Sequence, residues 1–203
     1  MKKIFALACI AMTVISTSCT KSDNDGDPVV GTTEEILVDA TANGVWQYFS
    51  FAEGRVIGSG EESADARWFA SDKWDMAISR YNLRFNGGPS YTSGGLGGVY
   101  TCDESISFAS ILSVPQGVTF TTDKSVTTEG MAGTTTTVKS AATVIIFKTD
   151  ADGSLVMPPV YLKAPVYIVR TADGESCYKV EFTQYKDEDN VSGMVRFNYA
   201  KIE

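Results

Sequence analysis

Short runs of β-branched and aromatic residues recur along the chain, and Gly, Asp or Asn ends almost every one of them. Strict alternation of apolar and polar residues is typical of a strand with one buried face. Residues 74–79 show it most clearly, because Trp, Met and Ile alternate there with Asp, Ala and Ser. The strands expected from this pattern are residues 35–38, 45–51, 73–85, 98–101, 117–121, 134–139, 143–148, 165–171, 177–185 and 193–199.

Helical periodicity is hard to find, and the best helix candidate, residues 61–70, is short. An Asp-Gly pair between the runs 165–171 and 177–185 is a strong β-hairpin signal. The sequence has no repeat of fixed period and no second domain boundary. It therefore predicts a single all-β domain, irregular and antiparallel, arranged as an open sandwich or an irregular barrel. Long loops are expected at residues 86–97 and 122–133.

The N-terminal segment has the pattern of an export signal. Lys2 and Lys3 precede an apolar stretch that is too short to span a bilayer, and small polar residues follow directly before Cys19. This pattern predicts a lipoprotein signal peptide at residues 1–18 and a lipidated Cys19, and the alternative is an ordinary signal peptide with an incidental cysteine. Residues 19–33 are polar and acidic, as in a flexible tether. Residues 34–203 are then the folded domain.

An acidic run directly after a lipidated cysteine resembles a surface-export signal of some Gram-negative lipoproteins. The expected location is therefore the outer membrane, lipid-anchored and facing the medium, and release from the cell stays open. The formal net charge of −8 becomes more negative once the two lysines of the signal are removed. Such a charge argues against nucleic acid and against anionic lipid as partners. Contact with the membrane is expected through the lipid anchor only.

The absence of histidine excludes several kinds of site. Ser-His-Asp and Cys-His catalysis, HExxH zinc sites and histidine-ligated haem all need this residue. A hydrolase that uses only carboxylates stays open, but we expect a binding protein rather than an enzyme. Two cysteines, Cys102 and Cys177, remain after the signal and Cys19, and an exported location would allow a disulfide between them. A disulfide and two buried thiols are equally compatible with the sequence.

The glycine-rich stretches 86–88 and 94–98 precede no helix, so they do not fit a phosphate-binding loop. We interpret them as loops in which the backbone passes close to another part of the molecule. Asp150 to Gly153 begins like a calcium loop but lacks the distal Glu, and it is interpreted as a turn.

The methionines differ in their surroundings. Met76 and Met194 lie in strand-like runs, where packing in the core is the default. Met131 lies between glycine and alanine in a Thr-rich loop, with no apparent core to join. Met157 precedes two prolines and has apolar neighbours, so packing is one interpretation of it. The other is ligation, because the methionine thioether is a soft donor and a known axial ligand of haem iron.

Several segments resemble the HmuY-like family of haem-binding lipoproteins. The most specific is KWDMAISRYNLRFNGG at residues 73–88, which is similar to a WD-containing strand ending in RYN and NGG. NGVWQYFSF at residues 43–51 resembles the opening strand of the family, and residues 178–182 and 193–199 resemble its closing strands. The resemblance covers residues 34–203.

The resemblance implies a hand-like all-β fold that holds haem, iron protoporphyrin IX, between two loop-bearing projections. It also implies capture of haem outside the cell, as a hemophore does, for iron acquisition, with host haemoproteins and an outer-membrane haem receptor as partners. The best-known member binds iron through two histidines, which this chain lacks, and methionine ligation is expected in other members. Met131 and Met157 lie where the resemblance places the ligands, so they are the expected axial ligands of the haem iron.

A surface lipoprotein that binds a glycan or a protein, without haem, is the alternative. Its binding surface would use exposed aromatic rings of the loops, such as Tyr91 and Tyr100, as stacking platforms. The competing interpretation of these two rings is packing in the core or on a strand.

Overall fold

The computed structural model describes residues 31–61, 66–131 and 133–203. The expected signal peptide, Cys19 and most of the expected tether lie outside these residues. No helix among the described residues is long and apolar enough to cross a membrane.

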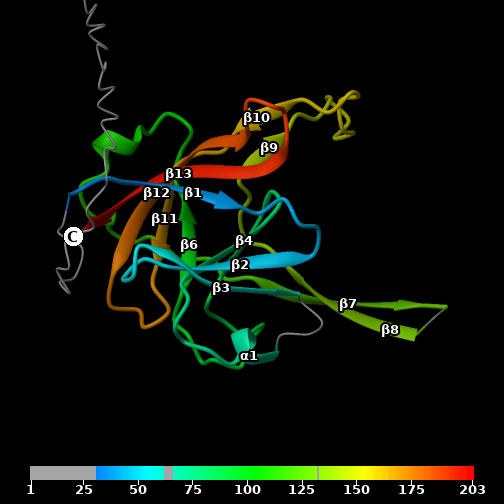
Figure 1. Ribbon diagram of the computed structural model, residues 1–203, viewed down its shortest axis with the longest axis horizontal. Coiled ribbons are helices and arrows are strands. Elements are labelled where there is room, and N and C mark those ends of the chain that lie inside the picture. The colour runs from blue at the N-terminus through cyan, green and yellow to red at the C-terminus, as the bar shows by residue number, and fades with distance from the viewer. Residues whose placement is uncertain (1–30, 62–65, 132) are drawn as a thin grey trace, which may run out of the picture.

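Two antiparallel sheets form the body of the molecule (Figure 1). The five-stranded sheet has the order β1 (Glu34–Asp39), β13 (Ser192–Ile202), β12 (Cys177–Lys186), β11 (Tyr167–Arg170) and β6 (Gly98–Thr101). The four-stranded sheet has the order β3 (Arg55–Glu61), β2 (Val45–Ser50), β4 (Met76–Ser79) and β5 (Asn82–Phe85). The prediction of an all-β antiparallel fold is thereby confirmed.

Two further pairs of strands extend from this body. One is the hairpin of β7 (Lys124–Gly130) and β8 (Gly133–Lys139), and the other pairs β9 (Ile145–Phe147) with β10 (Tyr161–Lys163). The helical elements are α1 (Ala66–Phe69) and the 3-10 turn η1 (Phe108–Ser110). Both pairs of strands point to the same side of the body in Figure 1.

The core between the two sheets is rich in aromatic side chains. Phe49 lies edge-on to Phe51, Phe197 and Tyr199, with ring centroids 5.2–5.6 Å apart, and Phe51 stacks on Tyr178 at 4.4 Å. A second cluster, on the other face of the four-stranded sheet, contains Trp46, Tyr48, Trp74, Ala77 and Tyr91. The four-stranded sheet is therefore covered on both faces.

This double burial corrects one detail of the sequence analysis. Residues 74–79 were expected to expose one face, but β4 is buried throughout. Met76 and Ile78 pack in the core between the sheets, whereas Trp74 and Ala77 pack in the second cluster. The polar member Asp75 is also buried, because backbone N–H groups surround its carboxylate.

The predicted strand 73–85 is in fact the hairpin of β4 and β5. Arg80 forms the turn with a positive φ of 55°, and its guanidinium donates hydrogen bonds to the carbonyl oxygens of Thr41 and Ser192. Met76 pairs with Phe85 and Ile78 with Leu83, and all four pack in the core, so the apolar positions are even-numbered in β4 and odd-numbered in β5. This one-residue shift of the alternation marks the turn, and the prediction of one continuous strand overlooked it.

The structure corrects other boundaries as well. The predicted loop 122–133 contains β7, and the sequence analysis missed β3 and β10. The predicted strand 117–121 contributes only the bridge between Thr121 and Val99. The helix candidate 61–70 reduces to α1 among its described residues, while the long loop at residues 86–97 and the Asp-Gly hairpin are confirmed.

The burial of Met76 leads to a stability prediction. Its side chain is fully buried, so Met76→Ala is expected to lower the free energy of unfolding by about 2–5 kcal/mol through lost contacts and the cavity left behind. Met131→Ala is the matched control, because Met131 is fully exposed and its loss should change stability by less than about 0.5 kcal/mol. Urea denaturation of both variants measures the difference. Equal stability of the two would contradict the packing described for β4.

Candidate functional site

The two pairs of strands outside the body define the candidate site. We call the β7–β8 hairpin the first projection, and β9, β10 and the loop of residues 148–160 between them the second projection. The chain passes from one to the other through residues 140–144, so the two are neighbours in sequence. Figure 1 shows that they leave the body in the same direction and that their backbones stay apart at the outer ends.

The two expected ligand methionines lie on different projections. Met131 follows the last pair of the first projection, Gly130 with Gly133, and is fully exposed. Met157 lies in the loop of the second projection, next to the cis peptide bond to Pro158, and 74% of its surface is exposed. Packing is therefore the wrong interpretation of Met157. Methionine is normally buried, so two exposed thioethers on two adjacent projections call for an explanation by binding.

Exposed apolar side chains accompany Met157 on the second projection. The large apolar residues exposed there are Leu155, Val160, Tyr161 and Leu162, and Val126 is exposed on the first projection. Neighbouring exposed apolar side chains of this kind are typical of surfaces that bind a partner or an apolar ligand. None of these was among the predicted site residues, although the sequence shows that Met157 has apolar neighbours.

Aromatic rings fix the base of the second projection. Phe147 on β9 lies edge-on to Tyr81 at 5.0 Å and to Tyr161 on β10 at 5.3 Å, and Tyr161 lies edge-on to Tyr185 at 5.8 Å. The ammonium of Lys186 lies 5.0 Å from the Tyr161 ring centroid, as in a cation–π contact. The exposed ring of Tyr161 is thereby held in place between the body and the loop that carries Met157.

One buried carboxylate fixes the base of the first projection. Asp123 directly precedes β7, and its Oδ2 accepts hydrogen bonds from the Phe85 amide at 2.9 Å and the Tyr91 hydroxyl at 2.6 Å. Its Oδ1 accepts from the amide of Ala141, just after β8, at 2.8 Å. Both ends of the hairpin are thus tied to the four-stranded sheet. Burial raises the pKa of Asp123 above the usual aspartate value, although these donors and nearby Arg84 act against the rise.

A second buried carboxylate joins the two sheets. Asp75 accepts hydrogen bonds from the amides of Phe51, after β2, and Ala172, after β11, both at 2.9 Å. Burial likewise raises its pKa. Neither aspartate was among the predicted site residues, because the residues around a single Asp do not show which distant amides it will meet.

The glycine-rich loops pass close to each other, which confirms the expectation of a close backbone approach. A Cβ on Gly87 would lie 2.0 Å from the carbonyl oxygen of Gly97, and one on Gly95 would lie 2.3 Å from that of Asn86. The Gly97 amide donates to the Asn86 carbonyl oxygen at 2.9 Å. The two glycine-rich stretches therefore pack directly against each other.

The two aromatic rings of the alternative glycan-binding hypothesis are packed to different degrees. Tyr91 is buried against Trp74 and donates its hydroxyl to Asp123. Tyr100 is half-buried and packs with Cys102 and Ile111. Packing is therefore the correct interpretation of Tyr91, whereas Tyr100 packs on one side and lines a cavity on the other.

Cys102 and Cys177 do not form a disulfide. The Cys102 amide donates to the Val166 carbonyl oxygen, whereas Cys177 pairs with Arg170, four residues farther along the same segment. Four residues of strand span about 13 Å, and a disulfide needs Cα atoms within about 7 Å of each other. The two cysteines are free thiols, and burial raises the pKa of each.

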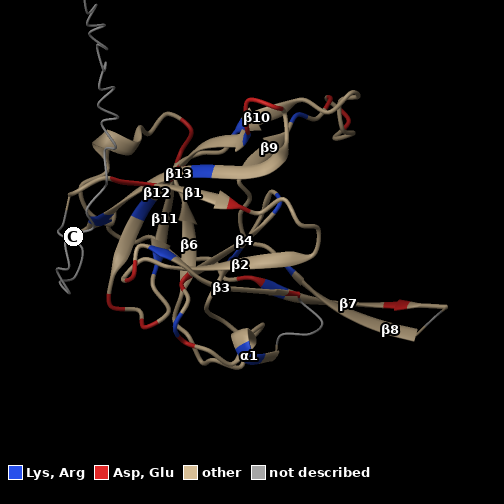
Figure 2. Cartoon of the chain, in the orientation of Figure 1, with Lys and Arg blue, Asp and Glu red and all other residues tan. Residues whose placement is uncertain are grey.

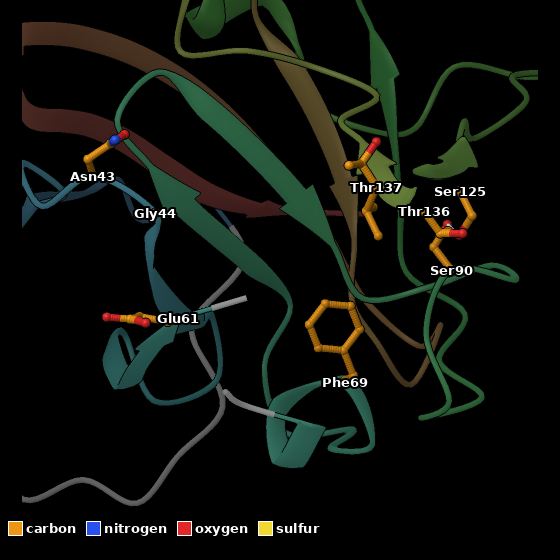
Figure 3. Close-up of a pocket in the computed structure, with 9 residues that line it drawn as sticks. Asn43, Gly44, Glu61, Phe69, Ser90, Ser125, Thr136 and Thr137 are labelled. Carbon is orange, nitrogen blue, oxygen red and sulfur yellow. Dashed lines mark hydrogen bonds between the residues drawn. The ribbon is translucent and has the colours of Figure 1, made fainter. Parts of the chain in front are cut away.

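A cavity of about 720 Å³ lies beside the base of the first projection (Figure 3). Hydroxyl groups supply much of its lining, together with one aromatic ring and one carboxylate. Its residues are Asn43, Gly44, Glu61, Phe69, Ser90, Ser125, Thr136, Thr137 and Val138. Neither Met131 nor Met157 lines it.

The chain matches the family described as HmuY protein over residues 42–199. No curated protein matches the chain. Several solved structures share the fold, and three of them are compared below. One, described as an HmuY-like haem-binding protein of Bacteroides vulgatus, is 21% identical with a TM-score of 0.57, and the match covers 86% of this chain and 96% of that one.

The second is the apo form of an HmuY analogue from Tannerella forsythia, 21% identical, with a TM-score of 0.55 and coverage of 86% and 98%. The third is a protein of Bacteroides fragilis described as a lipoprotein, 22% identical, with a TM-score of 0.56 and coverage of 83% and 90%. At these identities the neighbours support the fold alone. The family match extends over most of the chain, from before β2 into β13, and the chain therefore belongs to the HmuY family.

Proposed function

We propose that this protein captures haem outside the cell between its two projections, with Met131 and Met157 as the axial ligands of the iron. The observation that carries the proposal is the exposure of two thioethers, one on each of two neighbouring projections. The family and the Bacteroides vulgatus neighbour, described as haem-binding, support haem as the ligand. The exposed apolar side chains of the second projection supply a surface suited to the porphyrin face.

The chemistry of the donors fits haem iron. A thioether is soft and uncharged, so it favours ferrous over ferric iron. Two axial protein ligands would leave the iron no open position for a substrate, which is why the function is binding and not catalysis. The residues of the projections hold and orient the ligand, while the body keeps their bases in place through Asp123 and the aromatic rings around Phe147.

The N-terminal sequence supports a cellular location for this haem binding. A lipidated Cys19 and the acidic tether would hold the domain at the outer membrane, facing the medium. The Bacteroides fragilis neighbour, described as a lipoprotein, is consistent with such an anchor. From that position the protein would take haem from host haemoproteins and pass it to an outer-membrane receptor, as part of iron acquisition.

A haemin titration tests the proposal directly. We expect saturation at one haem per chain, a distinct Soret band, and tighter binding with a more completely low-spin spectrum after reduction by dithionite. The reason is the preference of thioethers for ferrous iron. Broad absorbance that does not saturate would mean nonspecific adsorption. In that case the haem proposal fails, and a glycan or protein becomes the ligand to seek.

A further inference from the structure

The first projection has two faces that its strand register defines. Residues directly opposite each other in an antiparallel pair share a face. One face, which we call the lysine face, carries Lys124, Val126, Thr128, Thr135, Thr137 and Lys139. The other, the Val138 face, carries Ser125, Thr127, Glu129, Thr134, Thr136 and Val138.

The Val138 face is turned toward the body and α1. Val138 packs against the cluster of Trp46 and Trp74, which Phe69 of α1 also joins. On the same face, the Ser125 hydroxyl donates to the Ser90 hydroxyl at 3.2 Å. In Figure 1, α1 lies below the base of the hairpin and the second projection lies above it. The lysine face is the opposite face of the hairpin, and the second projection lies on that side of the hairpin in Figure 1.

The basic and acidic residues of the hairpin lie on different faces and at different distances from its base. Lys124 and Lys139 lie directly opposite each other at the base, whereas the single acid of the hairpin, Glu129, lies near the tip on the other face. Figure 2 shows this separation as blue at the base of β7 and red farther out. Among the described residues, neither lysine forms an ion pair.

Two like charges directly opposite each other destabilise a strand pair. The chain as a whole is acidic, so an isolated cation pair on one face of a projecting hairpin is unusual for it. An anion between the two ammonium groups would remove the repulsion and convert it into attraction. Haem carries two carboxylates on one edge, its propionates, and is otherwise apolar.

We propose that Lys124 and Lys139 bind the propionates of haem, so that the propionate edge points toward the body and the porphyrin lies over the lysine face. This inference rests on the proposed function. The lysine pair and the pair Gly130–Gly133 are six residues apart along β7, about 20 Å of strand. Over that span, a lysine side chain extended from the base would meet the propionate edge of a haem that lies on this face, and the Met131 thioether, reaching back from the tip, would meet its iron. Val126, exposed between the two ends on this face, contacts the porphyrin.

The test compares haemin with haemin dimethyl ester, in which both propionates are esterified and uncharged. Wild-type protein should bind haemin about tenfold more tightly than the ester, equivalent to about 1.4 kcal/mol at 25 °C. The double variant Lys124→Gln, Lys139→Gln should lose about tenfold in affinity for haemin and little for the ester. Its preference for haemin should therefore disappear. Raising the salt concentration should also reduce the preference of the wild-type protein for haemin over the ester, because salt screens exposed charges.

The matched control is Lys73→Gln, Lys201→Gln, which changes the net charge equally but lies at the seam of the two sheets near Asp173. It should keep the wild-type preference for haemin. Equal wild-type affinity for haemin and the ester would overturn the assignment of the lysines and leave haem binding intact. Equal weakening of both ligands in the double variant would overturn it too. If neither porphyrin binds wild-type protein, the proposed function itself fails.

Discussion

The double variant Met131→Ala, Met157→Ala is expected to lose the six-coordinate low-spin spectrum of reduced haem and most of its affinity. Each thioether would supply one axial bond to the iron, and alanine supplies none. The single variants should each weaken binding and shift the reduced spectrum toward five-coordination. Absorption titration with reduced haem measures both the affinity and the coordination.

Leucine variants at the same positions separate ligation from apolar contact. Met131→Leu and Met157→Leu keep a side chain of similar size but remove the sulfur. Ligation predicts that they resemble the alanine variants in their spectra, whereas simple apolar contact predicts wild-type behaviour. Wild-type affinity and spectrum in both alanine variants would place the ligands elsewhere in the chain without affecting the family assignment.

The pH profile gives an independent check of the ligand type. A thioether has no proton to gain near neutrality, so ligation should persist down to about pH 5 while the fold is intact. A histidine site would weaken below an unperturbed pKa of about 6.5. The variant Met131→His, Met157→His should acquire that pH dependence and bind ferric haem more tightly than wild type does.

The second large effect is expected at the base of the first projection. Asp123→Ala removes the acceptor of the Phe85 and Ala141 amides and of the Tyr91 hydroxyl, all at a buried position. Each unsatisfied buried donor costs about 1–3 kcal/mol, and breaking a buried charged network costs about 3–5 kcal/mol. We therefore expect the free energy of unfolding to fall by about 3–5 kcal/mol. We also expect faster hydrogen exchange at the base of the hairpin.

Because its pKa is raised, the contribution of Asp123 to the free energy of unfolding depends on pH. Its folded pKa lies above its unfolded value, so the folded state binds the proton more tightly than the unfolded chain does. The stability from this proton linkage is present below about pH 3.9 and is lost as the pH rises through the raised pKa. Asp123→Ala should remove the part of the pH dependence of the free energy of unfolding that Asp123 causes. The part caused by Asp75 should remain, because the pKa of Asp75 is raised too.

A surface aspartate provides the control for Asp123. Asp152 lies in an exposed turn, where it accepts hydrogen bonds from the neighbouring residue Ser154. Asp152→Ala should therefore change stability by less than about 0.5 kcal/mol. Urea denaturation across a pH series compares the two variants with wild type. If Asp123→Ala unfolds at the wild-type urea concentration, the carboxylate does not hold the hairpin base.

The fold was predictable where local chemistry determines it. The Asp-Gly pair between β11 and β12 encodes its own turn, with Gly174 at a φ of 78°. The strand β7 was not predictable in the same way, because all its side chains are exposed and show no apolar alternation. The positive φ of Arg80 was not predictable for a different reason, since it is held by carbonyl oxygens of residues far away in the sequence.

The candidate site was predictable only in part, for similar reasons. Met131 has small polar neighbours, and its exposure follows from them. Met157 has apolar neighbours, and only the structure shows that those neighbours are exposed as well. The lysine face needs the register of β7 with β8, which pairs residues that the sequence alone does not align.

The position of β13 limits when the protein can finish folding. This last strand lies between β1 and β12, so the first strand of the domain pairs with the last, with Glu34 opposite Tyr199. Contacts between such distant parts of a chain form slowly, and β1 has no partner in its sheet until β13 is available. If the chain is exported N-terminus first, as the predicted signal peptide implies, its five-stranded sheet would stay incomplete during transport. The five-stranded sheet would close only after the final residues have crossed.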